Sequence, residues 1–429
     1  MAKTVMILGA YGLIGSACTR ALLAQGHRVI GVGRNLAATR HLPDSVQWMI
    51  RDLAQMDQAD WARDLQGVDA VVNCAGALQD GLRDSLTAIH ADMPTRLAAA
   101  LTGRDTLLVQ VSAAGVSPVA PTEFMRSKAK GDAAIMRSAP HWVILRPTLV
   151  LSPAAYGGTA LLRASAALPF AHFRALSGAR VQTVHVDDVA GAVVMAVNGA
   201  LPNGLMADLT EGRVHDFDDL QRRMRAWLGL PEWRNAIRVP AWMLGVTARI
   251  ADGLGWLGWR SPLRSTALES LRAGVVGDAT TWPGPPCRSL TQTLNDLPST
   301  QQERWFAHLY LLLPLSIGVL SLFWLLSGII GLVQAGTASE VLTARGFTAN
   351  WATGFVLTGG IVDIALGLGL LIRRFARRAA LGTIAVSLAY IVGAAVFAPD
   401  LWLDPLGPMV KVLPGIALSA IVALLVSDR

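Results

Sequence analysis

An uncharged apolar run of 25 residues, at 309–333, constrains this sequence more than any other feature. A helix rises about 1.5 Å per residue, so the run can cross a hydrocarbon core of about 30 Å. Similar runs at about 351–372, 379–398 and 406–426 predict four transmembrane helices within 309–427. The hydrophobic share of 52% and the charged share of only 16% agree with a chain that lies partly in lipid.

The loops between these runs predict the side of the membrane on which the rest of the chain lies. The link between the second and third runs is rich in arginine: Arg373, Arg374, Arg377 and Arg378. The loop after the third run carries Asp400 and Asp404 instead. Because basic loops stay in the cytoplasm, we expect the arginine link and the N-terminal head, two spans earlier, on the cytoplasmic side of the cell inner membrane. The membrane lipid bilayer is the first predicted partner.

Charge and cysteine content argue against two other classes of protein. The net charge of +7 is compatible with nucleic-acid binding, but the basic residues form no aromatic-interleaved patch and no nucleic-acid module. No nucleic-acid partner is therefore expected. Cys18, Cys74 and Cys287 are far apart and have no metal-ligand spacing, which predicts reduced thiols and no metal site.

The first 297 residues have a different pattern, in which short β-branched runs alternate with helical patterns. Strands separated by crossover helices form parallel sheets with both faces covered, so residues 1–150 are expected to form an α/β, Rossmann-type doubly wound domain. The pattern is less regular over 151–297, where we expect a small substrate lobe and amphipathic helices. A polar linker at 298–308 then leads to the all-α transmembrane bundle.

Three glycines follow the first predicted strand at a spacing of three: Gly9, Gly12 and Gly15. In a dinucleotide-binding turn the first glycine allows the bend, the second admits a pyrophosphate close to the backbone, and the third lets the helix pack on the sheet. We therefore predict that this turn, with Tyr11, Leu13 and Ile14, binds a nicotinamide dinucleotide. The alternative is a structural turn without a ligand.

The residue after the second strand indicates which nicotinamide cofactor fits. Arg34 stands where an acid would hold the ribose 2′-OH of NAD, and a guanidinium there can bind the 2′-phosphate of NADP. NADP is therefore favoured over NAD, with an ordinary surface arginine as the alternative. Asp52, after the third strand, either meets the adenine amino group or caps the next helix.

Seven motifs occur in the order and at the intervals typical of one enzyme superfamily. They are Gly9/Gly12/Gly15, RDL at 51–53, NCAG at 73–76, VSAAG at 111–115, RSKAKGD at 126–132, LRPTLVLSP at 145–153 and HVDDVA at 185–190. Over residues 3–300 the chain resembles the atypical, extended short-chain dehydrogenases/reductases. Within them it is similar to the NmrA-like proteins and to the NADPH-binding accessory subunit of respiratory complex I.

This resemblance implies how the cofactor would lie. The glycine turn would bind the pyrophosphate, and Asp52 and Leu53 would flank the adenine. The backbone of Ala75 and Gly76 would follow the cofactor toward its nicotinamide end. All of these positions are therefore predicted cofactor-binding residues.

At the nicotinamide end, the resemblance implies that Ser112 lies beside the ring and that Lys128 bonds to the ribose hydroxyls, so both are cofactor-binding and catalytic candidates. Phe124 occupies the position where active members carry a tyrosine. That tyrosine donates the proton that completes carbonyl reduction, and phenylalanine has none to give. None of the four tyrosines precedes a lysine by four residues, so catalysis needs another donor: water, the substrate or His185.

The HVDDVA motif has two interpretations. His185, Asp187 and Asp188 are suited to acid–base chemistry or metal binding. An aspartate before an apolar helical run is more often the N-cap of that helix, which we favour here.

Three tryptophans lie among apolar residues and arginines in the later part of the head: Trp242, Trp256 and Trp259. Amphipathic helices with Trp and Arg can lie in the headgroup layer of a membrane. The alternative of equal weight is a lid or core helix.

Two ionisable residues fall within the predicted spans, Asp363 in the second and Lys411 in the fourth. A charge at that depth is costly, so Asp363 is expected to be protonated, paired or facing a cavity, and Lys411 to extend outward. Through GGIVDIALGLGLLI and DPLGPMVKVLPG the tail resembles the DoxX-like family of four-span proteins. Relatives of that family occur beside quinone-linked oxidoreductases, which implies a respiratory-chain or quinone-linked partner.

These observations lead to one main hypothesis and two alternatives. The main hypothesis is a membrane-anchored, NADP-preferring oxidoreductase-like protein that acts on a hydrophobic small-molecule substrate, such as a quinone, isoprenoid or lipid, at the inner membrane face. One alternative is a non-catalytic NADPH-binding sensor or assembly module of a respiratory membrane complex, which Phe124 supports. The other is a transporter that uses Asp363.

Overall fold

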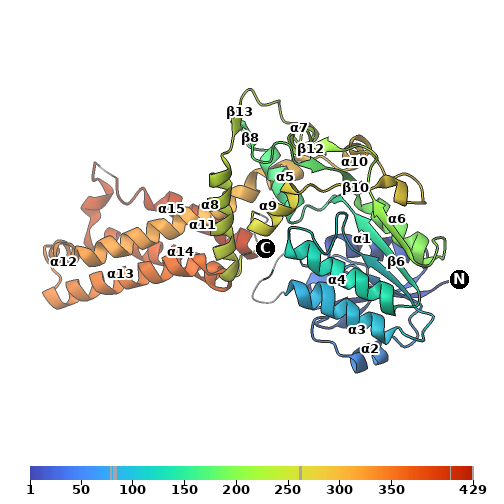
Figure 1. Ribbon diagram of the computed structural model, residues 1–429. Coiled ribbons are helices and arrows are strands. Elements are labelled where there is room, and N and C mark those ends of the chain that lie inside the picture. Colours follow the sequence, from blue (N-terminus) through green and yellow to red (C-terminus); the bar gives the residue numbers. More distant parts are fainter. Residues whose placement is uncertain (78–79, 81–84, 260–262, 406, 428–429) are drawn as a thin grey trace. The chain divides into compact units, whose positions relative to one another are not determined.

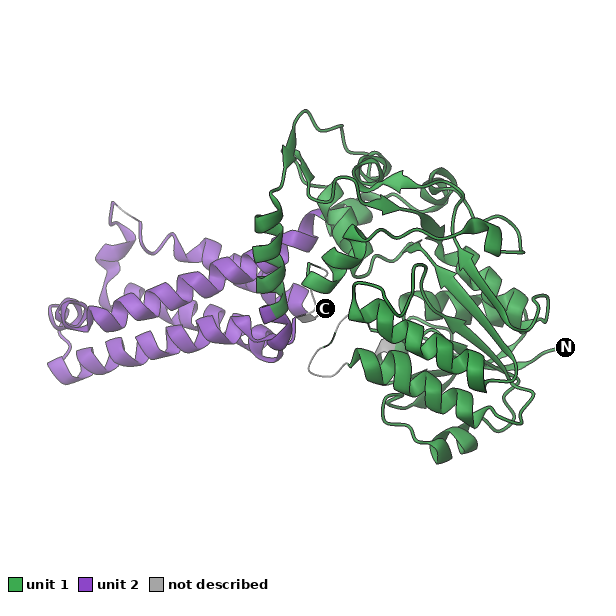
Figure 2. Cartoon of the chain, viewed as in Figure 1, with its two compact units in different colours: residues 1–252, 262–307 green, residues 253–261, 308–429 purple. Residues whose placement is uncertain are grey.

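The computed structural model describes residues 1–77, 80, 85–259, 263–405 and 407–427 (Figure 1). The chain forms two compact units (Figure 2). The first comprises 1–252 and 262–307, and the second comprises 253–261 and 308–429. The first unit therefore holds the predicted Rossmann domain and substrate lobe together, and the boundary drawn between them at 150 stays a prediction.

A parallel sheet of seven strands forms the centre of the first unit. Its strands are β1 (Thr4–Leu8), β2 (Arg28–Gly33), β3 (Gln47–Ile50), β4 (Ala70–Asn73), β5 (Leu107–Val111), β6 (Trp142–Pro147) and β11 (Leu205–Leu209). Their order is β11-β6-β5-β4-β1-β2-β3, and each neighbouring pair is parallel. The direction of strand succession reverses between β1 and β4, which is where doubly wound sheets bind their ligands.

Successive side chains of β1 point to opposite faces of the sheet, and both faces are covered by helices. Val5 and Ile7 face one core with the helices α1 (Leu13–Ala24) and α6 (Val186–Val197). Met6 and Leu8 face the other core with α2 (Gln58–Asp64), α3 (Met93–Ala100) and α4 (Glu123–Ser138). Figure 1 shows these two layers on opposite faces of the strands. The predicted α/β doubly wound fold is confirmed.

A smaller lobe follows β6 and has its own core, which includes Leu162, Leu220 and Leu290. Its strands are short: β7 (Leu149–Leu151), β8 (His172–Arg174), β9 (Arg180–Val181), β10 (Thr183–His185), β12 (His215–Asp216) and β13 (Ala236–Arg238). Its helices are α5 (Gly158–Ala166), α7 (Phe217–Trp227), α8 (Ala241–Trp256), α9 (Ser265–Arg272) and α10 (Leu290–Asp296). Short helical turns elsewhere in this unit are η1 (Leu36–Thr39), η2 (Ala88–Asp92) and η3 (Ala279–Thr281).

The second unit is helical. Its elements are α11 (Gln301–Val333), α12 (Ala335–Thr343), α13 (Ala349–Leu371), α14 (Arg373–Phe397), η4 (Pro399–Trp402) and α15 (Val412–Ser427). Among the described residues, α11, α13 and α14 are long and apolar enough to cross a membrane. These helices correspond to the first three predicted spans.

The predicted fourth span, 406–426, is wrong in its extent. Residue 406 lies outside the described residues, and α15 begins only at Val412 and has 16 residues. At about 1.5 Å per residue such a helix is about 24 Å long, short of a hydrocarbon core of about 30 Å. Lys411 is exposed and precedes α15, so it does not lie inside a regular helical span.

Small residues bring α11 and α13 close together. A Cβ added at Gly328 would lie 2.5 Å from the Gly360 carbonyl oxygen, and Ser321 donates a hydrogen bond of 2.8 Å to the Gly367 carbonyl. Glycine and serine at such crossings are typical of helix packing in lipid, where close backbone contact replaces the hydrophobic effect. The apolar sequence thus codes for a specific crossing of the helices as well as for membrane insertion.

Asp363 lies at this crossing and has two hydrogen-bond donors. The Ser327 hydroxyl donates to one carboxylate oxygen at 2.8 Å, and the Tyr390 hydroxyl donates to the other at 3.1 Å. The Asp363 side chain is buried, and its partners come from α11 and α14. A buried intramembrane carboxyl therefore links three helices through hydroxyl groups.

The close contact between α4 and η2 generates a stability prediction. A Cβ at Gly131 in α4 would lie 1.9 Å from the His90 carbonyl oxygen, whereas a Cβ at Gly191 in α6 would meet nothing within 4 Å. We expect Gly131→Ala to lower the free energy of unfolding by about 1–3 kcal/mol through overpacking. The matched Gly191→Ala should raise it by about 0.4–1 kcal/mol.

Thermal unfolding of the full-length protein in detergent measures both effects, because each kcal/mol of stability shifts the Tm by about 2–4 °C. A Gly131→Ala protein as stable as the wild type would contradict the packing described for α4 and η2.

Candidate functional site

The turn between β1 and α1 requires its glycines for steric reasons. Gly9 has φ +71°, and its amide donates to the Val32 carbonyl at 3.0 Å. A Cβ at Gly15 would lie 2.2 Å from the Gly9 carbonyl oxygen, and a Cβ at Gly9 would lie 3.0 Å from Ala75 Cα. The turn is therefore pressed against both the first turn of α1 and the end of β4, as a dinucleotide-binding turn must be.

The N-terminus of α1 is suited to an anion. Gly12 is the N-cap residue, makes no side-chain cap hydrogen bond, and the first turn of the helix holds no acid. The first intrahelical bond runs from the Ser16 amide to the Gly12 carbonyl, so the amides of Leu13, Ile14 and Gly15 precede the helical ladder. These amides and the helix dipole fit a pyrophosphate group.

Tyr11 and Arg34 meet at the end of β2. The Tyr11 hydroxyl accepts a hydrogen bond of 3.1 Å from the Arg34 amide. The Tyr11 ring lies against Gly33, where an added Cβ would be 2.1 Å from the ring, and its centroid is 6.4 Å from that of Trp48. The adenosine ribose of a dinucleotide binds at this edge of such sheets, and a place for Tyr11 and Arg34 beside its 2′ position stays a prediction.

The two residues predicted to flank the adenine differ in their environment. Asp52 is exposed, and its carboxylate accepts from the Ala54 amide at 3.2 Å, so it caps the turn after β3. The Leu53 side chain is 5% exposed and packs in the core beside Met56 and Trp61. Contact of either side chain with adenine stays a prediction.

The end of β4 is where four residues converge: Ala75, Gly76, His90 and Lys128. The Ala75 amide donates to the Asn73 side chain at 3.1 Å, which fixes the backbone after the strand. A Cβ at Gly76 would lie 3.2 Å from His90 Nε2 and 3.9 Å from Lys128 Nζ. The structure therefore brings together two motifs that the sequence places about 50 residues apart.

His90, which the sequence analysis missed, is the centre of a hydrogen-bonded chain. The Ala77 amide donates to His90 Nε2 at 3.1 Å, so Nδ1 carries the proton and donates to the Ser127 hydroxyl at 3.1 Å. Ser127 in turn donates to the Phe124 carbonyl at 3.1 Å. Burial, and secondarily the charge of Lys128, lowers the pKa of His90 to about 2. No motif pointed to this histidine, because its side-chain partners are a backbone amide and a serine.

Lys128 is buried and close to Phe124. Its ammonium donates to the Val111 carbonyl at 3.3 Å and lies 5.7 Å from the centre of the Phe124 ring. Burial lowers the pKa of Lys128, and the nearby Asp132 carboxyl partly opposes that shift. The Phe124 ring also stands edge-on to His90, with centroids 5.4 Å apart. Phe124 thus fills the place beside the lysine without supplying a proton.

The Ser112 hydroxyl has a partner within the protein. It donates to the Asp132 carboxylate at 2.6 Å, and the Ser112 side chain is 4% exposed. Arg146 lies 3.8 Å from the same carboxylate. Burial raises the pKa of Asp132, while the Ser112 hydrogen bond and the two cations, Lys128 and Arg146, oppose that shift. Asp132 ends the RSKAKGD motif but was not predicted as a site residue, because an acid within a helix has no distinctive sequence signal of its own.

In the HVDDVA motif the N-cap was predicted on the wrong residue. His185 itself caps α6, since its Nδ1 accepts from the Asp187 amide at 3.1 Å. Asp188 pairs with Arg288 at 3.0 Å. The helix begins at Val186, three residues before the apolar run that starts at Val189, because β10 leads directly into it. Both aspartates therefore fall in its first turn, where their negative charge interacts favourably with the helix dipole.

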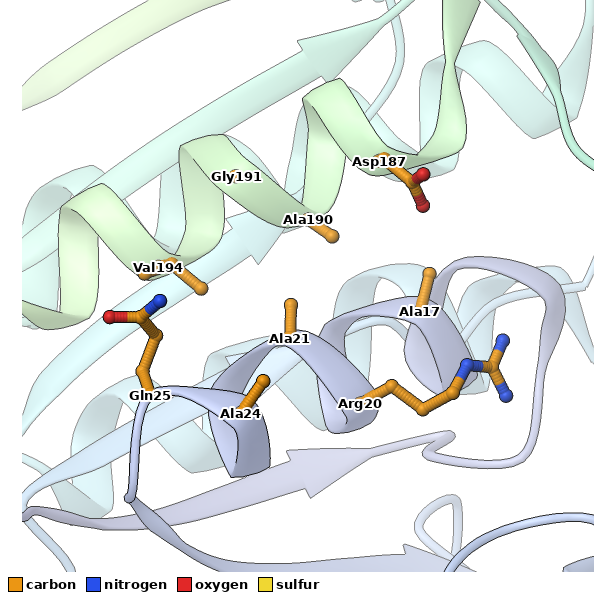
Figure 3. A pocket seen from close by; sticks show the side chains of 9 residues that line it. All are labelled: Ala17, Arg20, Ala21, Ala24, Gln25, Asp187, Ala190, Gly191 and Val194. Carbon is orange, nitrogen blue, oxygen red and sulfur yellow. The ribbon is translucent and has the colours of Figure 1, made fainter. Parts of the chain in front are cut away.

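An open groove of about 400 Å³ runs between α1 and α6 (Figure 3). Small residues such as Ala17, Ala21 and Gly191 line it, and Arg20 and Asp187 lie at one end. The groove follows the later turns of α1 and does not include its N-terminus, so it is distinct from the predicted pyrophosphate site.

Two family models match separate parts of the chain. Residues 9–198 match the model described as NAD(P)H-binding, and residues 321–420 match the DoxX-like family. These matches confirm the two resemblances that the sequence motifs predicted.

A probable low-salt glycan biosynthesis reductase of Haloferax volcanii is 30% identical to this chain over 166 residues, which are 34% of the chain. The chain spans about half, 52%, of that curated relative. Among solved structures, the chain is similar to the enzyme WbmH of Bordetella bronchiseptica in complex with NAD+, with a TM-score of 0.48 and 22% identity over 56% of this chain and 86% of that one. The enzyme WbmG of the same organism, in complex with NAD and UDP, has a TM-score of 0.47 and 19% identity over 56% and 84%.

The state of His90 generates a pH prediction. Because its folded pKa is about 2 and its unfolded pKa about 6.5, the folded protein binds fewer protons, and stability is lost as the pH falls below about 6.5. Between pH 6 and 4 the slope from this group approaches about 1.4 kcal/mol per pH unit. We expect His90→Gln to remove that contribution, as measured by chemical unfolding over a pH series. An unchanged slope would contradict a neutral, buried His90.

Proposed function

We propose that this chain, which joins an NAD(P)-binding domain of the short-chain dehydrogenase/reductase type to a DoxX-like membrane domain, is a membrane-anchored oxidoreductase that prefers NADP. The observation that carries the proposal is the glycine turn at the switch point of the sheet, with α1 directed at the place of a pyrophosphate. The curated relative named as a reductase supports the redox assignment.

The NADP preference is supported by the end of β2. Arg34 is exposed directly after Gly33, and no acid follows this strand before η1. A guanidinium can bind a 2′-phosphate through charge-assisted hydrogen bonds, whereas NAD would gain from an acid at this place. Tyr11 accepts from the Arg34 amide and so helps to hold the arginine at the ribose edge.

The chemistry at the nicotinamide end is limited by the groups that this chain supplies. A bound NADPH supplies a hydride for a carbonyl or quinone acceptor. The buried Lys128 would hold the ribose hydroxyls and provide positive charge beside them, for which it must exchange its bond to the Val111 carbonyl. Phe124 and neutral His90 give no proton to the substrate, so we propose water as the donor for the oxygen that forms.

A hydrophobic substrate at the inner membrane face completes the proposal. The apolar helices α11, α13 and α14 support a location in the membrane, and the four arginines in the first two turns of α14 support a cytoplasmic head. Anchoring raises the rate of encounter with a quinone, isoprenoid or lipid that partitions into the bilayer. A respiratory-chain or quinone-linked partner is part of the same proposal.

A second candidate function is a non-catalytic NADPH-binding sensor or assembly module. Two observations favour it: Phe124 stands where an acid would be needed, and the Ser112 hydroxyl is engaged by Asp132. Such a protein would bind NADPH but would not transfer its hydride to a quinone or an aldehyde.

Arg34 tests the cofactor preference. We expect Arg34→Ser to weaken NADPH binding about 10- to 100-fold, since a hydrogen bond to a charged group contributes about 1.5–3 kcal/mol, and to leave NADH binding nearly unchanged. Arg28→Ser is the matched control, because Arg28 lies at the opposite end of β2. Fluorescence titration of the full-length protein in detergent measures both affinities. Equal losses for NADPH and NADH would contradict the assignment of Arg34 to the 2′-phosphate.

Phe124 tests the redox function. NADPH oxidation by the wild type with a panel of quinones and aldehydes separates the oxidoreductase from the sensor. We expect Phe124→Tyr to raise the rate of carbonyl reduction at least about tenfold. A well-placed general acid contributes a factor of about 10²–10⁴ to such a rate. Phe124→Leu controls for a change in packing. Normal NADPH binding with no turnover in the wild type or in Phe124→Tyr would reject the oxidoreductase and leave the sensor.

A further inference from the structure

Helix α8 has an unusual distribution of side chains. Its buried positions carry small residues, Ala248 and Ala251, each 5% exposed. Its large apolar residues point outward instead: Trp242 is 70% exposed, Ile250 60% and Trp256 72%. Burial of large apolar side chains is the main stabilising force for a helix on a water-soluble domain, so this arrangement indicates a partner on the outer face.

The exposed apolar residues form one continuous stripe. Trp242, Met243, Val246, Ile250, Trp256 and Leu257 are all exposed, and at 100° per residue they fall within an arc of about 140°. Arg249 lies beside the two tryptophans on the same side of the helix and is also exposed. Asp252, at the border of the stripe, is paired with Arg264 at 3.1 Å. The exposed face is therefore apolar, aromatic and basic.

The last turn of α8, from Gly253, belongs to the second unit. Directly after the helix, the Leu257 carbonyl accepts from the Arg373 amide at 3.0 Å, and the Trp259 indole donates to the Leu371 carbonyl at 2.7 Å. The Arg373 guanidinium lies 5.6 Å from the centre of the Trp259 ring. Leu371 ends α13 and Arg373 begins α14, so the four arginines predicted as a link lie in the first two turns of α14, where the ends of two apolar helices meet.

We propose that α8 is an interfacial helix whose exposed stripe binds the headgroup layer of the phospholipid bilayer. The stripe ends at Leu257, which contacts the start of α14 beside the end of α13. For this reason we favour lipid as its partner over a second copy of the chain or a soluble protein. Tryptophan at both ends of the stripe and an arginine beside it suit the boundary between acyl chains and headgroups, where an indole buries its ring and a guanidinium reaches phosphate.

The proposal does not depend on cofactor binding or turnover. It gives the substrate lobe, to which most of α8 belongs, a second membrane attachment besides α11. A lobe held at the bilayer surface would receive a lipid-soluble molecule without that molecule crossing water.

Lipid photolabelling of the full-length protein tests the proposal. The probe is a phospholipid with a diazirine on its headgroup, in nanodiscs of phosphatidylcholine and phosphatidylglycerol that hold one chain each, followed by peptide mass spectrometry. We expect label on peptides covering 241–257, comparable to that at the ends of α13. The double variant Val246→Glu/Ile250→Glu should lose that label severalfold and keep the label on α13.

Thr247→Glu is the matched control, because Thr247 is exposed on α8 just outside the stripe and receives the same charge. It should retain most of the label, and equal thermal stability of the three proteins excludes misfolding as the cause. If the wild-type helix carries no more label than the solvent-exposed turns of α7, or if the double variant labels like the wild type, the proposal is wrong. Cross-linking of α8 to a second copy in detergent, without lipid label, would equally overturn it.

Discussion

The contact of backbone with backbone at the β1–α1 turn is the constraint on which the rest of the head depends. Gly9 touches the end of β4, and Gly15 touches Gly9, at distances that leave no room for a side chain. This contact places the N-terminus of α1 at the carboxyl edge of the sheet, next to the point where strand order reverses. Arg34 and Gly76 follow β2 and β4, which end at this edge, and Lys128 reaches the same edge from within α4 through its bond to the Val111 carbonyl at the end of β5.

Much of the fold could be predicted because its signals are local. Glycine spacing, alternating strands and helices, and long uncharged runs each depend on neighbouring residues, and they predicted the doubly wound sheet and the membrane helices α11, α13 and α14. The end of the bundle was harder to predict, since the residues at 407–411 were expected inside the fourth span but precede the helix, which begins at Val412. Helix α12 was not predicted, because it is short and only moderately apolar.

The candidate site was harder to predict than the fold because its residues come from distant segments. Gly9, Gly76 and Lys128 were identified through motifs, and the structure brings Gly76 and Lys128 together. His90 lies outside the seven motifs, and Asp132 lies within one but was not predicted as a site residue, although one contacts the Ala77 amide and the other holds Ser112. Such partners depend on a helix packing at a particular distance, here α4 on η2 through Gly131, and no pattern in the sequence encodes that distance directly.

The site is therefore better equipped to hold a dinucleotide than to move a proton. Its hydroxyl and imidazole groups are engaged within the protein, and its aromatic residue beside Lys128 is a phenylalanine. In the membrane domain, by contrast, Asp363 is a buried carboxyl whose two hydroxyl partners come from neighbouring helices. The predicted nucleotide site and the buried Asp363 carboxyl thus belong to separate units of one chain, and the nucleotide site is the part on which the proposed function rests.

The most direct test of the central claim, that the amides at residues 13–15 hold a pyrophosphate, is calorimetric titration of the full-length protein in detergent with NADPH and with fragments of it. The account predicts one NADPH per chain, displaced by ADP-ribose 2′-phosphate, which retains the pyrophosphate, and not by nicotinamide mononucleotide, which lacks it. Failure to bind NADPH, or binding that the pyrophosphate-containing fragment leaves unchanged, would contradict the account.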